Sequence, residues 1–152
     1  MSGLTDIDRA LLLRAISLAD NCPPSTTAFA VGALIAMADG RVLGEGWSRK
    51  SDPHVHAEEA ALADVADPSL LAEATIYSSL EPCSTRASRP VSCTQHILIA
   101  GIPRIVYAWR EPSLFVDCIG DELLRAAGRD VIFVPELTEA AREPNLHLFG
   151  YQ

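Results

Sequence analysis

Basic residues are scarce in this sequence, and their scarcity limits the partners that it suits. Twelve lysines and arginines stand against twenty aspartates and glutamates, so the net charge is −8. A field of that sign repels the phosphate backbone of nucleic acids unless a local cationic patch overrides it. Long nucleic acids are therefore disfavoured partners, whereas a small phosphorylated metabolite is compatible with the charge.

Long apolar runs are missing as well. No stretch approaches the ~20 consecutive apolar residues that a membrane-spanning helix needs. Residues 1–9 lack the basic region, apolar run and small-residue cleavage site of a secretory signal. The chain also has no internal repeat and no low-complexity tract. We therefore expect a cytoplasmic protein that does not contact a membrane.

Cysteine is rare, with four residues in a chain of 152. In a reducing compartment, cysteines accompanied by a histidine serve in metal or redox sites more often than in disulfides. The composition, 49% apolar and 21% charged residues, is that of a globular protein with a core of its own. We predict a single domain over residues 1–152, in which residues 137–152 form a C-terminal helix and tail.

Helix and strand patterns alternate along the chain. Helical periodicity or an excess of helix-forming residues predicts helices at residues 7–19, 54–65, 92–100, 120–127 and 137–142. Short apolar runs bounded by turn residues predict strands at residues 29–37, 42–47, 74–80, 104–108 and 131–134, of which the first two form a β-hairpin. The later strands alternate with helices, which implies parallel neighbours. The fold class is therefore α/β, a three-layer α/β/α domain around a central mixed sheet of about five strands.

Three residues offer the donor atoms of a zinc site. His56 lies at the start of a predicted helix, Cys83 follows a proline after a predicted strand, and Cys93 lies at the start of the next helix. Catalytic zinc takes three protein ligands of this kind and leaves a fourth position for water. The positive end of a helix dipole, together with the metal, favours thiolate over thiol. His56, Cys83 and Cys93 are therefore the predicted ligands of a Zn²⁺ cofactor.

Glu58 is the predicted catalytic residue. It follows His56 by two positions, close enough to face the fourth metal position without binding the metal. A carboxylate in this place can take a proton from the zinc-bound water, whose pKa the metal lowers towards ~7, and deliver it to a bound substrate. His-x-Glu followed by Pro-Cys-x-x-Cys is the signature of zinc deaminases. His56-Ala57-Glu58 and Pro82-Cys83 match it, although nine residues instead of two separate Cys83 from Cys93.

Further motifs extend this likeness over roughly residues 10–134. They are Val31-Gly32-Ala33, Gly44-Glu45-Gly46-Trp47, Ala60-Ala61-Leu62, Ser79-Leu80-Glu81-Pro82-Cys83-Ser84, residues 111–116, and Gly120 with residues 124–128. With the long segment between the two cysteines, they make the chain similar to the zinc-dependent cytidine/deoxycytidylate deaminase superfamily. Within it, the chain most resembles the deaminase domain of the bifunctional deaminase/reductase enzymes of riboflavin biosynthesis.

The resemblance implies a cytidine-deaminase-like fold and a hydrolytic deaminase. In such an enzyme a zinc hydroxide attacks the amino-bearing carbon of a pyrimidine-type ring, and ammonia leaves. In the riboflavin branch the substrate is a diaminopyrimidinone with a phosphoribosylamino group. Arg89 stands where that branch has a basic residue near the substrate phosphate, and Arg86 is a second cation in the same segment. With these two arginines, the candidate substrate-binding residues are Phe29, Ser48, Ala57 and Ser79.

Other substrates stay open because the chain departs from the riboflavin branch. Ala28 stands where that branch has asparagine, and Ser48 and Thr85 stand where it has histidine. Residues 29–33 are similar instead to the free cytidine deaminases. Cytidine, deoxycytidylate and a secondary-metabolite heterocycle are therefore alternatives. The net charge argues against a deaminase of single-stranded nucleic acids, and the retained Glu58 argues against a catalytically silent zinc-binding module.

The resemblance also implies which proteins this chain associates with. It implies a homodimer or larger homo-oligomer, for which the apolar helix at residues 95–100 is a candidate surface, and a separate reductase if the chain acts in riboflavin synthesis. Phe29 and Trp47 suit either the pocket, by stacking on a heterocycle, or the core. Cys22 and Cys118 have no motif around them, so we expect small, reduced core residues there.

Overall fold

The computed structural model describes residues 3–84, 91–110 and 118–149. A mixed sheet lies at its centre, with its five strands in the order β2-β1-β3-β4-β5. The strands are β1 (Gly32–Met37), β2 (Val42–Trp47), β3 (Ala74–Ser78), β4 (Arg104–Tyr107) and β5 (Asp130–Phe133). β1 runs antiparallel to β2 and β3, whereas β3, β4 and β5 are parallel to one another. The beginning of β1 and the end of β3 therefore lie side by side, at the same end of the strands.

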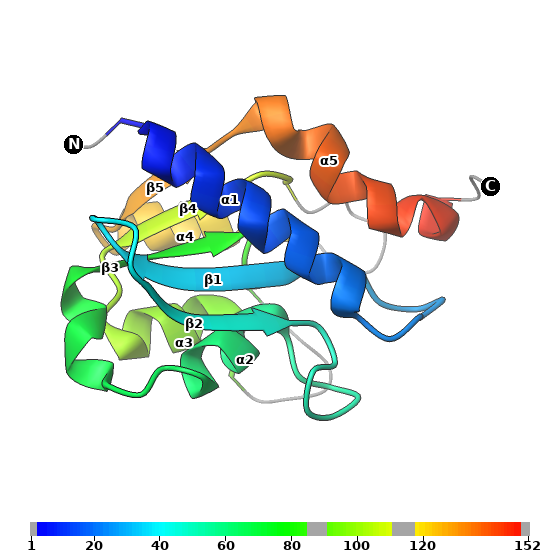
Figure 1. Cartoon of the computed structure of the whole chain (residues 1–152), viewed down its shortest axis with the longest axis horizontal. Coiled ribbons are helices and arrows are strands. Elements are labelled where there is room, and N and C mark those ends of the chain that lie inside the picture. The colour runs from blue at the N-terminus through cyan, green and yellow to red at the C-terminus, as the bar shows by residue number, and fades with distance from the viewer. Residues whose placement is uncertain (1–2, 85–90, 111–117, 150–152) are drawn as a thin grey trace.

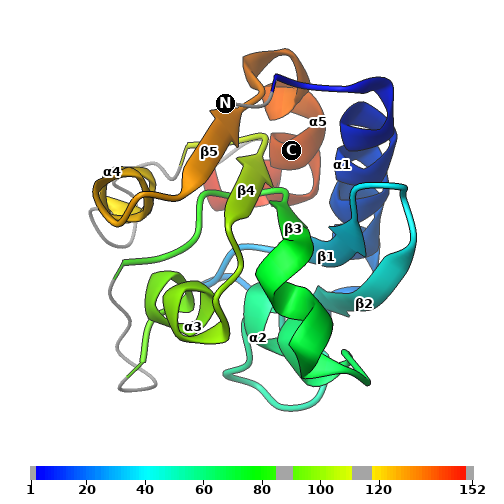
Figure 2. The ribbon, with the colours of Figure 1, turned by 90° about the vertical axis from the view of Figure 1, so that its left-hand side faces the viewer.

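Helices cover both faces of this sheet (Figure 1 and Figure 2). α1 (Asp6–Leu18) and α5 (Thr138–Arg142) lie on one face, and α2 (Ala57–Ala63), α3 (Cys93–Ala100) and α4 (Gly120–Ala126) lie on the other. Short 3-10 helices follow at Ala19–Asn21, Pro68–Glu73, Pro135–Leu137 and Glu143–Phe149. Within the described ranges, no helix combines the length and the apolar character needed to cross a membrane.

The predicted three-layer α/β/α architecture is confirmed, but two elements begin three residues later than predicted. β1 begins at Gly32 because the preceding N–H groups bond to side chains: that of Ala30 donates to Asn145 Oδ1 and that of Val31 to Ser48 Oγ. α2 begins at Ala57 because residues 52–55 form a turn, in which the N–H of His54 donates to the Asp52 carboxylate at 2.7 Å. Side-chain acceptors thus compete with the regular backbone pattern; the acceptor is close in the sequence for α2, and the acceptors are distant for β1.

Two glycines of β2 allow α2 to lie close against the sheet. A Cβ atom at Gly44 would lie 2.5 Å from the carbonyl oxygen of Ala61, and one at Gly46 would lie 2.5 Å from that of Ala57. Such distances are too short for non-bonded atoms in a close-packed interior, so a larger residue would displace α2. α2 carries Glu58 and begins directly after His56. These glycines therefore determine how close both residues of the site described below lie to the sheet.

A buried ion pair fastens α1 to the sheet. Asp8 is 3% exposed and accepts hydrogen bonds from Tyr77 Oη at 2.6 Å and from Arg104 Nη1 and Nη2 at 2.7 and 2.6 Å. The N–H of Thr5 donates to the same carboxylate at 2.8 Å. Burial by itself disfavours the charged form, but these hydrogen bonds outweigh it and hold the pKa of Asp8 well below its usual value.

We expect this carboxylate to make the protein sensitive to acid. A group whose pKa is lowered by folding stabilises the folded state above its unfolded pKa, near 3.8 for Asp8, and this contribution declines as the pH falls. Asp8→Asn should lower the free energy of unfolding by about 2–3 kcal/mol at pH 7. The difference in the free energy of unfolding between Asp8→Asn and the wild type should be smaller by roughly 1 kcal/mol at pH 3 than at pH 7.

Urea denaturation of both proteins at the two pH values measures this gap. Asp20→Asn, at an exposed carboxylate, is the matched control and should show no comparable narrowing. A gap for Asp8→Asn that stays constant from pH 7 to pH 3 would contradict the role assigned to the ion pair.

Candidate active site

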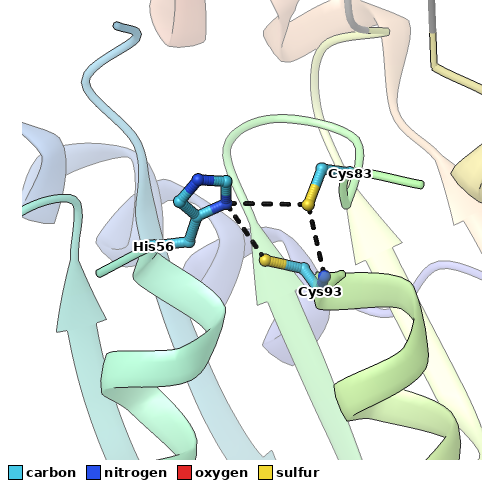
Figure 3. Close-up of side chains that lie close together, drawn as sticks. All are labelled: His56, Cys83 and Cys93. Carbon is cyan, nitrogen blue, oxygen red and sulfur yellow. Dashed lines mark hydrogen bonds between the residues drawn. The ribbon is translucent and has the colours of Figure 1, made fainter. Parts of the chain in front are cut away.

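Three donor side chains meet where the end of β3 faces the starts of α2 and α3 (Figure 3). His56 directly precedes α2, Cys83 lies beyond the end of β3, and Cys93 is the first residue of α3. Their ligand atoms all lie within 4.8 Å of one another. Both cysteines are buried, and Cys93 is wholly inaccessible. Among the described residues, this is the one cluster of three metal-ligating side chains; we call it the donor cluster.

The geometry of the donor cluster fits a zinc ion. His56 Nδ1 lies 3.2 Å from Cys93 Sγ and 3.6 Å from Cys83 Sγ. In a tetrahedral site with Zn–S bonds of about 2.3 Å and Zn–N bonds of about 2.0 Å, neighbouring ligand atoms lie roughly 3.5–3.8 Å apart. The His56–Cys83 distance therefore already fits such a site, and the His56–Cys93 distance needs only a small increase. One nitrogen and two sulfur atoms suit zinc, whereas calcium and magnesium require oxygen ligands.

The backbone around Cys83 is held by elements that follow it in the chain. The N–H of Glu81 donates to the carbonyl of Trp109 at 2.8 Å, and the Glu81 carboxylate accepts the N–H of Asp121 at 2.9 Å. The N–H and hydroxyl of Thr94 donate to the Cys83 carbonyl at 3.0 and 2.8 Å. Both sides of Cys83 are thus held by contacts that do not involve a metal.

The two thiols ionise with unequal ease. The N–H of Cys93 donates to Cys83 Sγ at 3.2 Å. Hydrogen bonding from Cys93, aided by that from His56, lowers the pKa of the Cys83 thiol to about 4 despite its burial. Burial raises the pKa of Cys93 well above its ordinary value, and its hydrogen bond to Cys83 adds to the effect. One sulfur is therefore ready as a thiolate, and a cation in the site favours ionisation of the second.

Glu58 lies on the first turn of α2 beside the thiols. It is 4% exposed, and its Oε1 accepts a hydrogen bond of 2.8 Å from Ser78 Oγ. Burial raises the pKa of the Glu58 carboxyl, and the neighbouring His56, Cys93 and Ser78 offset this only in part. A buried carboxyl with a raised pKa is suited to take up a proton and release it again. This placement suits the proton-transfer role predicted for Glu58.

The predicted substrate-binding serines lie at the edge of the sheet that carries the donor cluster. Ser48 Oγ accepts the N–H of Val31 at 3.0 Å, and Ser79 Oγ accepts the N–H of Gly32 at 3.1 Å. Ala57, the first residue of α2, is 1% exposed. Both hydroxyls thus order the start of β1, and contact of these three residues with a substrate stays a prediction.

Phe29 packs in an aromatic cluster. Its ring meets Trp109 edge-on with centroids 5.1 Å apart and stacks on Phe149 at 6.3 Å. Phe29 is 8% exposed, so packing is the role that the structure describes for it. Trp47, the other aromatic candidate, is half-buried, with Lys50 Nζ 4.6 Å above its ring.

The remaining sequence candidates fall outside the donor cluster. Arg86 and Arg89, the predicted phosphate contacts, lie outside the described residues, as does the motif at residues 111–116. Cys22 and Cys118 are half-buried, and their thiols donate to the carbonyls of Val31 at 3.5 Å and Pro82 at 3.2 Å.

The sequence analysis missed two buried polar residues, one beside Glu58 and one that holds the segment before β1. Ser78 contacts Glu58, and the alternation of side chains along β3 could have indicated it, because Ser78 and Tyr77 must face opposite sides of the sheet. Asn145 is wholly buried; it accepts the N–H of Ala30 at 2.6 Å and donates to the Ala30 carbonyl at 3.0 Å. No local pattern joins Asn145 to a partner 115 positions away.

Residues 5–109 match the family model for the cytidine and deoxycytidylate deaminase zinc-binding region. The chain belongs to this family. The match contains His56, Glu58, Cys83 and Cys93, so the family's metal and the donor cluster agree: the cofactor is zinc. A member of this zinc-binding deaminase family is a hydrolase that acts on C–N bonds.

The names of individual relatives within this deaminase family are more specific than the family description. The chain is 38% identical to a diaminohydroxyphosphoribosylamino-pyrimidine deaminase of Schizosaccharomyces pombe over 84% of its own length and 31% of the relative's. Among solved structures, RibD of Acinetobacter baumannii has a TM-score of 0.77 at 27% identity, covering 95% of this chain and 39% of RibD. An Aspergillus oryzae Rib2 deaminase in complex with DARIPP has a TM-score of 0.70 at 25% identity, covering 85% of this chain and 84% of that one. The chain thus spans 31–40% of the length of the curated relatives it matches first.

Proposed function

We propose that this protein is a zinc-dependent deaminase of an amino-substituted pyrimidine, and that its substrate is the riboflavin precursor diaminohydroxyphosphoribosylaminopyrimidine. The observation that carries the proposal is the meeting of one imidazole nitrogen and two thiols within 4.8 Å, with the buried Glu58 beside them. The name of the Schizosaccharomyces pombe relative supports this substrate, and the Aspergillus oryzae neighbour is likewise named as a Rib2 deaminase.

The roles of the residues follow from their positions. His56, Cys83 and Cys93 hold zinc, which when bound lowers the pKa of water and supplies the nucleophile. Glu58 would accept a proton from the attacking water and donate it to the ring nitrogen beside the reacting carbon. It would then move the proton of the hydroxyl newly bonded to that carbon to the amino group, so that the C–N bond breaks, ammonia leaves and a carbonyl remains. The buried surroundings of Glu58 keep its proton from exchanging freely with bulk water.

The substrate phosphate requires cations that the donor cluster does not supply. Arg86 and Arg89, between the two cysteines in the sequence, carry the required charge, and arginine suits phosphate through its planar, multiply donating guanidinium group. We assign them to phosphate binding as part of the same proposal, with Phe29, Ser48, Ala57 and Ser79 as the other residues that border the substrate.

The proposal extends to partners and location. The name of the similar Thermotoga maritima structure gives both a deaminase and a reductase, so a reductase is the expected functional partner of this chain in riboflavin synthesis. Self-association is supported by apolar side chains left exposed on α3 and at the start of α4, with Ile99 78%, Ile119 46% and Leu123 40% exposed. The predicted cytoplasmic location belongs to this proposal as well.

Cytidine or deoxycytidylate is the second candidate substrate. The family model takes its name from these compounds, and residues 29–33 are similar to the free cytidine deaminases. Deamination of bases in nucleic acids is disfavoured by the net charge of −8. A silent zinc-binding module would have no use for a buried carboxylate next to the metal site.

Ammonia release from a panel of substrates tests the proposal. The panel contains the riboflavin precursor, cytidine, deoxycytidylate, cytosine, guanine and adenosine, each incubated with zinc-loaded protein and with Glu58→Ala as the blank. We expect turnover of the riboflavin precursor alone. Turnover of cytidine or deoxycytidylate instead would keep the chemistry and replace the substrate, and silence on the whole panel would overturn the proposed function.

A further inference from the structure

One buried hydroxyl, that of Ser78, touches the carboxylate to which we assign proton transfer. Ser78 is the last residue of β3 and is 0% exposed. Its Oγ lies 2.8 Å from Glu58 Oε1 and 2.7 Å from the carbonyl oxygen of Leu80. The hydroxyl therefore stands between the catalytic carboxylate of α2 and the backbone that leads to Cys83.

The chemistry of a hydroxyl suits this position. A serine hydroxyl carries one hydrogen and two acceptor lone pairs, so it can donate to a carboxylate or accept from a carboxylic acid. The Leu80 carbonyl accepts the hydrogen whenever Glu58 does not. Ser78 can thus stay in contact with Glu58 throughout a reaction in which the carboxyl gains and loses a proton.

The neighbouring serine does a different task. Ser79 Oγ accepts the N–H of Gly32 and thereby joins the end of β3 to the start of β1. Tyr77, on the other side of Ser78, turns to the opposite face of the sheet, where its hydroxyl donates to Asp8. Of these three consecutive residues, Ser78 is the one whose side chain reaches Glu58.

We propose that Ser78 is a positioning residue that fixes the orientation of the Glu58 carboxylate through this hydrogen bond; the role in turnover rests on the function proposed above. A glutamate side chain has several rotatable bonds, and proton transfer demands hydrogen-bond geometry at both the nucleophile and the leaving amine. A misplacement of about 1 Å can cost roughly 100-fold in rate. The strand holds Ser78 rigidly, so its hydrogen bond limits where the carboxylate can point.

The first test is steady-state kinetics with matched variants. Ser78→Ala should lower kcat by about 10–100-fold with KM within about twofold of wild type and zinc content unchanged. Ser78→Thr keeps the hydroxyl and should recover most of the loss. Thr75→Val removes a buried hydroxyl from the same strand at a position outside the site, and should leave kcat unchanged. A kcat for Ser78→Ala within threefold of wild type, or a kcat for Ser78→Thr as low as that of Ser78→Ala, would overturn the proposal.

The second test does not depend on activity. In thermal unfolding of zinc-loaded protein, Ser78→Ala should lower the melting temperature of the wild type by at least about 2 °C more than that of Glu58→Ala, because the hydrogen bond exists only in the first background. Equal shifts in both backgrounds would mean that the two side chains are not coupled, and would overturn the proposal. If the wild type is inactive on the whole panel, the proposed function fails, and this cycle alone decides whether Ser78 holds Glu58.

Discussion

Replacing Glu58 by glutamine is expected to lower kcat by about 10³-fold, the largest effect of any single substitution that leaves zinc in place. Glutamine has nearly the same shape and keeps an oxygen that can accept the hydrogen bond from Ser78, so packing should change little. What it loses is the ability to take up a proton. The fall in kcat of Glu58→Gln therefore measures proton transfer separately from the structural contributions of the side chain.

Two measurements together check this result. Ammonia release gives kcat, and elemental analysis gives the zinc content, which should equal that of the wild type. Glu73→Gln, at an exposed carboxylate, controls for the change in net charge and should remain fully active. A kcat of Glu58→Gln within tenfold of the wild type would contradict the proton-transfer role. Loss of zinc from this variant would mean that Glu58 is a metal ligand.

Replacing Cys93 by serine is expected to abolish zinc binding and activity together. Cys93 is wholly buried and its sulfur lies 3.2 Å from His56 Nδ1, so a neutral hydroxyl in its place removes one of the two anionic donors. Even residues that only support metal ligands cost about 10–100-fold in affinity when they are changed. We therefore expect the dissociation constant for zinc to rise by more than about 100-fold.

Competition with a chromophoric chelator measures that constant. Cys22→Ser is the matched control, because Cys22 is half-buried and outside the donor cluster, and it should bind zinc as the wild type does. The thermal stability of Cys93→Ser should no longer depend on added zinc, since a protein gains stability only from a ligand that its folded state binds. Wild-type affinity in Cys93→Ser would remove this residue from the ligand set.

The elements of the fold could be predicted because each has a strong local pattern. α3, for example, begins at Cys93 behind the capping serine Ser92, and ends at Gly101, whose φ of 79° favours glycine. The predicted start of β1 was wrong because its decisive partner is distant. The start of β1 depends on Asn145, and no property of residues 29–31 records that contact.

The donor cluster could be predicted for a different reason. Its members are distant in the chain, but each lies in a short motif, and the chemistry of zinc narrows the choice to histidine and cysteine. The residues that support the donors have no such motif. Asp121 is fixed by contacts of its carboxylate with Tyr107 Oη and Arg125 Nε, and its N–H holds the Glu81 carboxylate. A network of this kind depends on packing in three dimensions, which a pattern of residue types does not encode.

The hydrogen bonds that hold the backbone around Cys83 affect the order in which the chain folds and binds zinc during synthesis. Cys93 is the last donor to leave the ribosome, yet Glu81, which precedes Cys83, is held by the carbonyl of Trp109 and the N–H of Asp121. Chains emerge from the N-terminus and fold as their later segments become available. A nascent chain that reaches only Ala100 therefore contains every metal donor and the Thr94 contacts with Cys83, but it lacks Trp109 and Asp121, the partners of Glu81. We therefore expect a nascent chain to bind zinc stably only after β4 and α4 have emerged, so that the ion enters a nearly folded protein.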